Sequence, residues 1–265
     1  MLTLGEAGGL TLAAAAAGAI NAVAGGGTLV TFPTLLAFGT TPVVANATST
    51  LALVIGTSGG MLGNRQYIAP IMPWLRRFLP VSLLGGLIGS WLLTHTSNDT
   101  FARLVPFLIF FATILFMAQG VFRRWAAPPP PGADGAPGSP NFLGAVVFQF
   151  FVAIYGGYFG AGIGILMLAT LGFLGLRNIY EMNTLKTILG SLINVVAALW
   201  FIAAGLIDWP RASVMTLGAF IGYYYGSRFT QRIPPARVRQ LIMAIGLLIS
   251  LQTFYKQFLQ PAAPH

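Results

Sequence analysis

The sequence predicts an all-α membrane protein that crosses the bilayer several times and is built from two inverted repeats. Apolar residues make up 56% of the 265 positions and charged residues only 7%, whereas a soluble domain carries roughly 25% charged residues. Such a chain has too little charge to cover a surface that faces water. In addition, one pattern occurs twice, at a constant offset of 137 residues. An internal repeat in so hydrophobic a chain is typical of transporters.

The repeat matches residues that break helices or pack them together. Its matches are Ala24-Gly25-x-Gly27-x-Leu29 with Ala161-Gly162-x-Gly164-x-Leu166, Asn46 with Asn183, Thr50 with Thr187, Pro73 with Pro210, and Gly85-x3-Gly89-Ser90 with Gly222-x3-Gly226-Ser227. We interpret the last pair as small-residue surfaces on which helices approach closely.

Hydropathy divides each half into five apolar segments. They cover residues 9–24, 28–39, 43–63, 72–94 and 101–122 in the first half, and 142–159, 163–176, 180–205, 210–228 and 237–257 in the second. A full span needs about 20 residues, so the second segment of each half is too short. Each opening pair therefore predicts a hairpin that enters the bilayer and returns. A proline- and glycine-rich linker, 126–141, separates the first repeat, 1–125, from the second, 142–265.

The arginines predict how the segments are oriented, because cytoplasmic loops carry an excess of Lys and Arg. They gather in four places: Arg65, Arg76 and Arg77; Arg123 and Arg124; Arg177; and Arg228, Arg232, Arg237 and Arg239. If all of these face the cytoplasm, the linker is cytoplasmic and both termini lie outside. The two hairpins then enter from opposite faces and equivalent segments run in opposite directions. Carriers with such inverted repeats bind substrate near the midplane, where the repeats meet.

Composition also limits the kinds of site. The net charge of +9 is explained by the cytoplasmic arginines, so we expect no nucleic-acid partner. The chain has no cysteine and only two distant histidines, His95 and His265, so we expect neither a metal site nor another cofactor. An enzyme is disfavoured because no His, Ser and Asp constellation lies at one depth in the membrane.

Two features of the sequence predict an anion site. Glycines interrupt the apolar runs at Gly25-Gly26-Gly27, before Thr28, and at Gly162 and Gly164. The short helix after each break directs its unpaired N–H groups toward the interior, where they suit an anion. Tight turns or close packing are the alternative. Polar stripes follow on one helix face in each half: Asn183, Lys186, Thr187 and Asn194, with the counterparts Asn46, Ser49, Thr50 and Thr57.

Lys186 is the only charge well inside a predicted span. An ammonium there costs at least about 2.5–3.5 kcal/mol, so it normally faces a cavity or a partner. We predict that it binds an anionic substrate, with snorkelling toward the cytoplasm as the alternative. Asn46 and Asn183 either bind substrate or hold helices together. The predicted substrate-binding set is Gly25, Gly26, Gly27, Thr28, Asn46, Ser49, Thr50, Gly162, Gly164, Asn183, Lys186, Thr187 and Asn194.

These residues resemble a known family. Ala24-Gly25-Gly26-Gly27-Thr28-Leu29 leading to Pro33, then Gly39-x2-Pro42-x2-Ala45-x-Ala47-Thr48-Ser49, resembles the first-half signature of the TauE/SafE sulfite exporters, and Asn183-x2-Lys186 with Leu192-Ile193-Asn194 resembles the second. The resemblance implies an inner-membrane carrier that exports sulfite, a sulfonate or another small sulfur-containing anion. An anion channel, a carrier for another anion such as a carboxylate, and a membrane scaffold are the alternatives. The expected partners are the substrate and the lipid bilayer, and a homodimer is compatible with the sequence.

Overall fold

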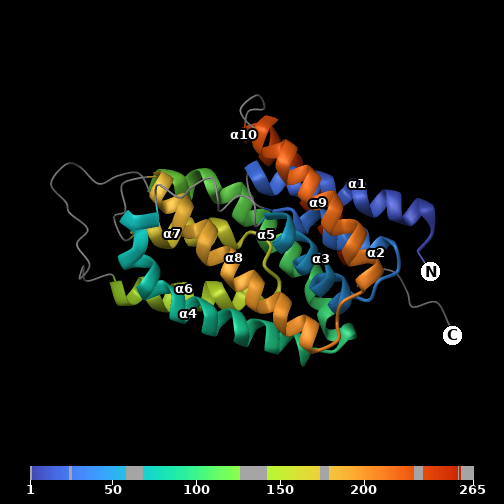
Figure 1. Ribbon diagram of the computed structural model, residues 1–265, viewed down its shortest axis with the longest axis horizontal. Coiled ribbons are helices and arrows are strands. Elements are labelled where there is room, and N and C mark those ends of the chain that lie inside the picture. Colours follow the sequence, from blue (N-terminus) through green and yellow to red (C-terminus); the bar gives the residue numbers. More distant parts are fainter. Residues whose placement is uncertain are drawn as a thin grey trace.

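A computed structural model describes residues 2–23, 26–57, 68–125, 142–173, 179–229, 235–255 and 257. Gly25 and the linker at 126–141 lie outside these residues. The described residues form ten α-helices (Figure 1), namely α1 (Leu4–Val23), α2 (Thr28–Ala37), α3 (Pro42–Thr57), α4 (Ile68–Thr94), α5 (Asn98–Trp125), α6 (Phe142–Tyr158), α7 (Ile163–Phe173), α8 (Ile179–Ala203), α9 (Trp209–Phe229) and α10 (Pro235–Phe254).

The all-α prediction is confirmed, and each of the ten predicted apolar segments contains a helix. Among the described residues, three helical stretches are long and apolar enough to cross a membrane: Ile68–Thr94, Asn98–Ala118 and Glu181–Ala203. The opening pairs differ from these. Helices α2 and α7 have only 10 and 11 residues, about half of what a span needs. Each follows a longer helix after a glycine-containing break, as the hairpin prediction required.

The outer surface of the helices is apolar. Large hydrophobic side chains are exposed along α4, α5, α6 and α9, among them Leu84, Ile88, Trp91, Phe107, Phe110, Ile114, Phe148, Phe151, Leu217, Phe220 and Ile221. A soluble monomer rarely exposes so much continuous apolar surface, which suits contact with lipid. The chain is therefore a membrane protein that crosses the bilayer several times.

The helices pack into two bundles, and each bundle contains one helix from the opposite half of the chain. Helix α1 lies along α9, and its repeat counterpart α6 lies along α4. Similarly, α3 packs on α9 and α8 packs on α4. We call α1, α2, α3 and α9 the first bundle, and α4, α6, α7 and α8 the second. Each bundle thus takes three helices from one half and one from the other. Figure 1 shows α4 beside α6 at one edge and α1 with α9 toward the N-terminus.

Glycines allow the two exchanged pairs to pack closely. A Cβ on Gly218, Gly222 or Gly226 of α9 would overlap the backbone of Thr11, Ala15 or Ala19 of α1, in that order. This order shows that α1 and α9 run parallel.

On the other pair, a Cβ on Gly85 or Gly89 of α4 would overlap the backbone of α6, at Phe150 and Ile154. Helices α4 and α6 therefore also run parallel. The prediction of small-residue packing surfaces is confirmed for Gly85, Gly89, Gly222 and Gly226. The side chain of Ser227 is not among those that the structure describes.

Candidate functional site

A cavity of about 390 Å³ lies between the two bundles. The first bundle contributes Asn21 and Ala22 at the end of α1, Gly26 and Thr28 at the first hairpin, Thr50 and Leu53 of α3, and Tyr223 of α9. The second bundle contributes Phe159, Gly160 and residues 162–165 at the second hairpin, and the polar face of α8. That face consists of Asn183, Lys186, Thr187, Gly190, Ser191 and Asn194.

The structure brings most of the predicted set to this cavity. Gly26, Thr28, Thr50, Gly162, Gly164, Asn183, Lys186, Thr187 and Asn194 line it. Three others lie outside the lining, namely Gly27, Asn46 and Ser49. The remaining member, Gly25, is not among the described residues. The second half therefore supplies more of the polar lining than the first.

The second hairpin directs the N-terminus of α7 toward the cavity. The chain leaves α6 after Tyr158 and turns through Gly160 and Gly162, whose φ angles are 81° and 79°. Residues other than glycine are strained in that left-handed region because of their Cβ atom. The hydroxyl of Tyr155 donates a hydrogen bond to the carbonyl of Ala161, over 2.7 Å, and so holds the turn.

Lys186 lies against this helix terminus. A Cβ built on Gly164, in the first turn of α7, would be 3.4 Å from Cδ of Lys186. Among the described residues Lys186 has no hydrogen-bond or ion-pair partner, and none of those that line the cavity is acidic. An ammonium beside the partial positive charge of a helix N-terminus is unfavourable unless an anion binds both. The arrangement thus suits a small anion.

The first hairpin is held differently. Oδ1 of Asn21 accepts hydrogen bonds from the backbone N–H groups of Gly26 and Gly27, over 2.8 and 2.7 Å. The φ angle of Gly26 is 137°, a conformation open to glycine. Because the Asn21 side chain already occupies these two donors at the start of α2, they are less available to an anion than those of α7.

Asn46 and Ser49 hold helices together instead of lining the cavity. Nδ2 of Asn46 donates to the carbonyl of Tyr158 over 3.0 Å, and Ser49 shares a hydrogen bond with Thr31 of α2. Both side chains are fully buried. This arrangement matches the alternative that Asn46 joins helices, and it separates Asn46 from its counterpart Asn183.

Sequence reasoning missed four polar side chains of this site, those of Asn21, Tyr155, Ser191 and Tyr223. Two of them stand opposite a glycine, Gly18 for Tyr155 and Gly86 for Tyr223, and Asn21 stands opposite a residue of another type, Tyr158. A search based on repeated positions therefore passes over them. Ser191, by contrast, follows Thr187 by one helical turn and could have been found from helical spacing.

Replacing Asn21 with alanine is expected to destabilise the first hairpin. The change leaves two backbone donors of a buried turn without their acceptor, and loss of a comparable helix cap costs about 0.5–2 kcal/mol. The thermal unfolding midpoint of the purified protein should fall. Asn21→Asp keeps an acceptor oxygen and serves as the control for side-chain size; equal stability of the alanine variant and the parent protein would contradict this role.

Comparison with known proteins gives a consistent result. The sequence model of the family "Sulfite exporter TauE/SafE" matches residues 10–253. A probable membrane transporter protein of Haemophilus influenzae is 25% identical over 90% of both chains. The probable membrane transporter protein YfcA of Escherichia coli K12 is 24% identical over 90% of this chain and 86% of its own. A probable membrane transporter protein of Sinorhizobium, ORF9, is 25% identical over 92% of this chain and 90% of its own. No solved structure matches the chain.

Proposed function

Since the chain belongs to the TauE/SafE sulfite exporter family, we propose that it is a carrier that exports a small sulfur-containing anion, sulfite or an organosulfonate, across the inner membrane. The relatives are named as membrane transporters, which supports transport over enzymatic activity. The observation that carries the proposal is Lys186, without a partner among the described residues and packed against the first turn of α7.

The lining of the cavity suits a monovalent anion. Lys186 supplies one positive charge and the α7 terminus a partial one, while Asn183, Thr187 and Asn194 offer hydrogen bonds. No counter-charge from the described lining competes with the ligand. A membrane potential of about 100 mV, negative inside, favours outward movement of one such charge by roughly 2.3 kcal/mol. Export therefore needs no tightly coupled proton.

The packing of the helices supports the inverted topology. Helices α1 and α9 run parallel, as do α6 and α4. These are the relative directions expected if the hairpins enter from opposite faces, with both termini outside and the linker in the cytoplasm. Lys186 lies near the start of α8, shortly after Arg177. In this topology Lys186 lies in the cytoplasmic half of the membrane, the side from which an exporter takes up its substrate.

Binding and flux measurements test the proposal. We expect sulfite, thiosulfate or a sulfonate to raise the thermal unfolding midpoint of the purified protein more than acetate or another carboxylate does. Proteoliposomes should then show saturable flux of that anion and accelerated exchange when the same anion is present on the opposite side. Flux that rises linearly with concentration would indicate a channel. A selective response to carboxylates would assign the site to another class of anion.

A further inference from the structure

We propose that the bodies that move during transport are the two exchanged bundles, not the two sequence repeats. The inference rests on the proposed transport function for the purpose of the motion, but its evidence is the packing of the helices. In this arrangement α9 moves with the first three helices of the chain, and α4 moves with α6, α7 and α8.

Contacts within each bundle join the halves of the chain firmly. In the second bundle, Gln149 of α6 donates to Ser82 of α4 over 3.0 Å, and both side chains are buried. In the first bundle, the N–H of Asp208, just before α9, donates to the Thr48 hydroxyl of α3 over 3.1 Å. Nη2 of Arg211 donates to the carbonyl of Phe38, after α2, over 3.0 Å.

The glycine surfaces strengthen the same grouping. They bring the backbones of α1 and α9, and of α4 and α6, into direct contact. Closely packed backbones have no side-chain layer that could repack, so such pairs move as one body. Separation of the two repeats would have to break both glycine surfaces.

The contact between the bundles is of another kind. Its principal element is α3 against α8, and the cavity lies within it. Asn46 of α3 donates across it to the carbonyl of Tyr158, but Oδ1 of Asn46 has no hydrogen-bond partner among the described residues. No described glycine of α3 or α8 would place a Cβ against the other of these two helices, so this interface lacks the close backbone contacts that join α1 to α9 and α4 to α6.

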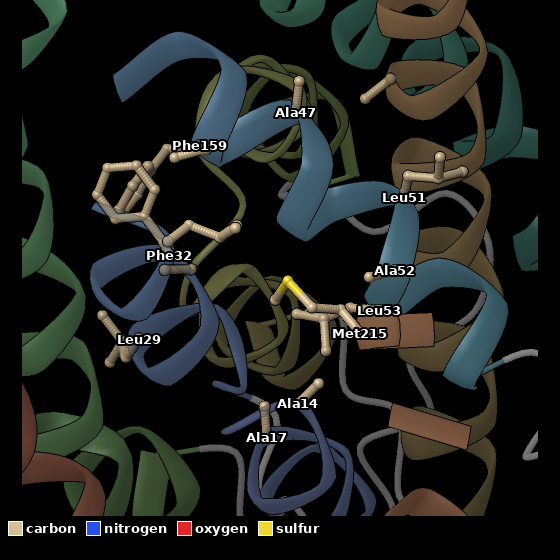
Figure 2. Packing of buried hydrophobic residues seen from close by; sticks show 14 of the residues in the cluster. Ala14, Ala17, Leu29, Phe32, Ala47, Leu51, Ala52, Leu53, Phe159 and Met215 are labelled. Atoms are coloured by element: carbon tan, nitrogen blue, oxygen red, sulfur yellow. The ribbon is translucent and has the colours of Figure 1, made fainter. Parts of the chain in front are cut away.

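Aromatic rings also pack across the contact between the bundles. Phe32 of α2 meets Phe159 edge to face, with centroids 5.5 Å apart. Figure 2 shows these two side chains near one another. Phe159 also lines the cavity. Phe101 of α5 touches both rings, at 6.2 and 6.4 Å. The ring contact between Phe32 and Phe159 thus joins the two bundles beside the cavity, and the bundles cannot part there without breaking it.

Paired spin labels can distinguish the two groupings, because the chain has no cysteine of its own. Leu4 of α1, Leu84 of α4 and Ile221 of α9 are 96%, 56% and 50% exposed, and Leu84 and Ile221 are repeat counterparts. Labels at Leu4→Cys and Ile221→Cys join different repeats in one bundle. Labels at Leu4→Cys and Leu84→Cys join different bundles in one repeat. Distances are measured by electron paramagnetic resonance in lipid nanodiscs.

Two conditions are compared with the unmodified state: added sulfite, and a Phe159→Ala background that removes the ring contact between the bundles without any ligand. We expect the distance between Leu4 and Leu84 to shift or to split into two populations. The distance between Leu4 and Ile221 should keep one unchanged peak. A third pair, Leu143→Cys with Leu84→Cys, lies within the second bundle and should also remain fixed.

The opposite pattern, a fixed distance between Leu4 and Leu84 with a changed one between Leu4 and Ile221, would show that the repeats move and would overturn the inference. So would the absence of any change in both conditions. Flux assays on the parent protein are read separately. Bundle motion without anion flux would refute the proposed substrate and leave the grouping intact, whereas flux without bundle motion would refute the grouping alone.

Discussion

Lys186→Gln is expected to lower the apparent affinity for the transported anion about 10- to 100-fold in proteoliposome flux assays. The ammonium is the only charge of the described cavity lining, and it lies against the first turn of α7. A hydrogen bond to a charged group contributes about 1.5–3 kcal/mol, and every 1.4 kcal/mol corresponds to about a tenfold change in affinity.

Two matched variants make this test specific. Lys186→Arg keeps the charge and should retain more transport than the glutamine variant, although the wider guanidinium alters the geometry. Arg103→Gln removes one charge from an exposed position on α5, far from the cavity lining in sequence and absent from it, and should leave affinity unchanged. Parental affinity in Lys186→Gln would remove the lysine from the site.

Gly157→Ala is expected to destabilise the whole protein. A Cβ at Gly157 of α6 would overlap the carbonyl oxygen of Gly86 of α4, so the two helices must move apart. Overpacking of this kind costs typically about 1–3 kcal/mol. The thermal unfolding midpoint in detergent should fall, together with the yield of monodisperse protein.

The same helix provides the control. A Cβ at Gly144 would meet nothing within 4 Å, and alanine is a better helix former than glycine by about 0.8–1.0 kcal/mol. Gly144→Ala should therefore maintain or raise the unfolding midpoint. If both substitutions shift the midpoint equally, close packing of α6 on α4 does not limit stability.

Hydropathy predicted the helical segments well because each helix buries or exposes a long apolar run. It misplaced the start of α1, which begins at Leu4 instead of residue 9. The polar side chains there form a reciprocal cap: the N–H of Thr3 donates to the Glu6 carboxylate over 3.0 Å, and the N–H of Glu6 donates to the Thr3 hydroxyl over 3.2 Å. An apolar scan does not detect such a start.

The exchange of helices could not be predicted in the same way. Hydropathy identifies which segments are apolar, but it does not say which segments become neighbours. Repeat positions likewise identified Lys186 and Asn183 but treated Ser49 and Asn46 as equivalent to them. The structure separates these pairs because Asn46 bonds to the carbonyl of Tyr158 and Ser49 bonds to Thr31. The hairpin turns also differ, since Asn21 holds the first and Tyr155 the second. The two halves thus share a helix order while using different side chains at the hairpin turns.

Exchange of α4 and α9 also bears on how such a chain is made and how it arose. Neither bundle is complete until the second half of the chain has been synthesised. Helix α4 lacks its partners until α6 to α8 have been made, and the first three helices lack α9 until it has been made. A fragment that ends at the linker would lack partners for the face of α1 that packs on α9 and for the glycine surface of α4. By the same reasoning, an ancestor with a single repeat could complete these bundles only as an antiparallel pair of identical chains, each lending its fourth helix to the other.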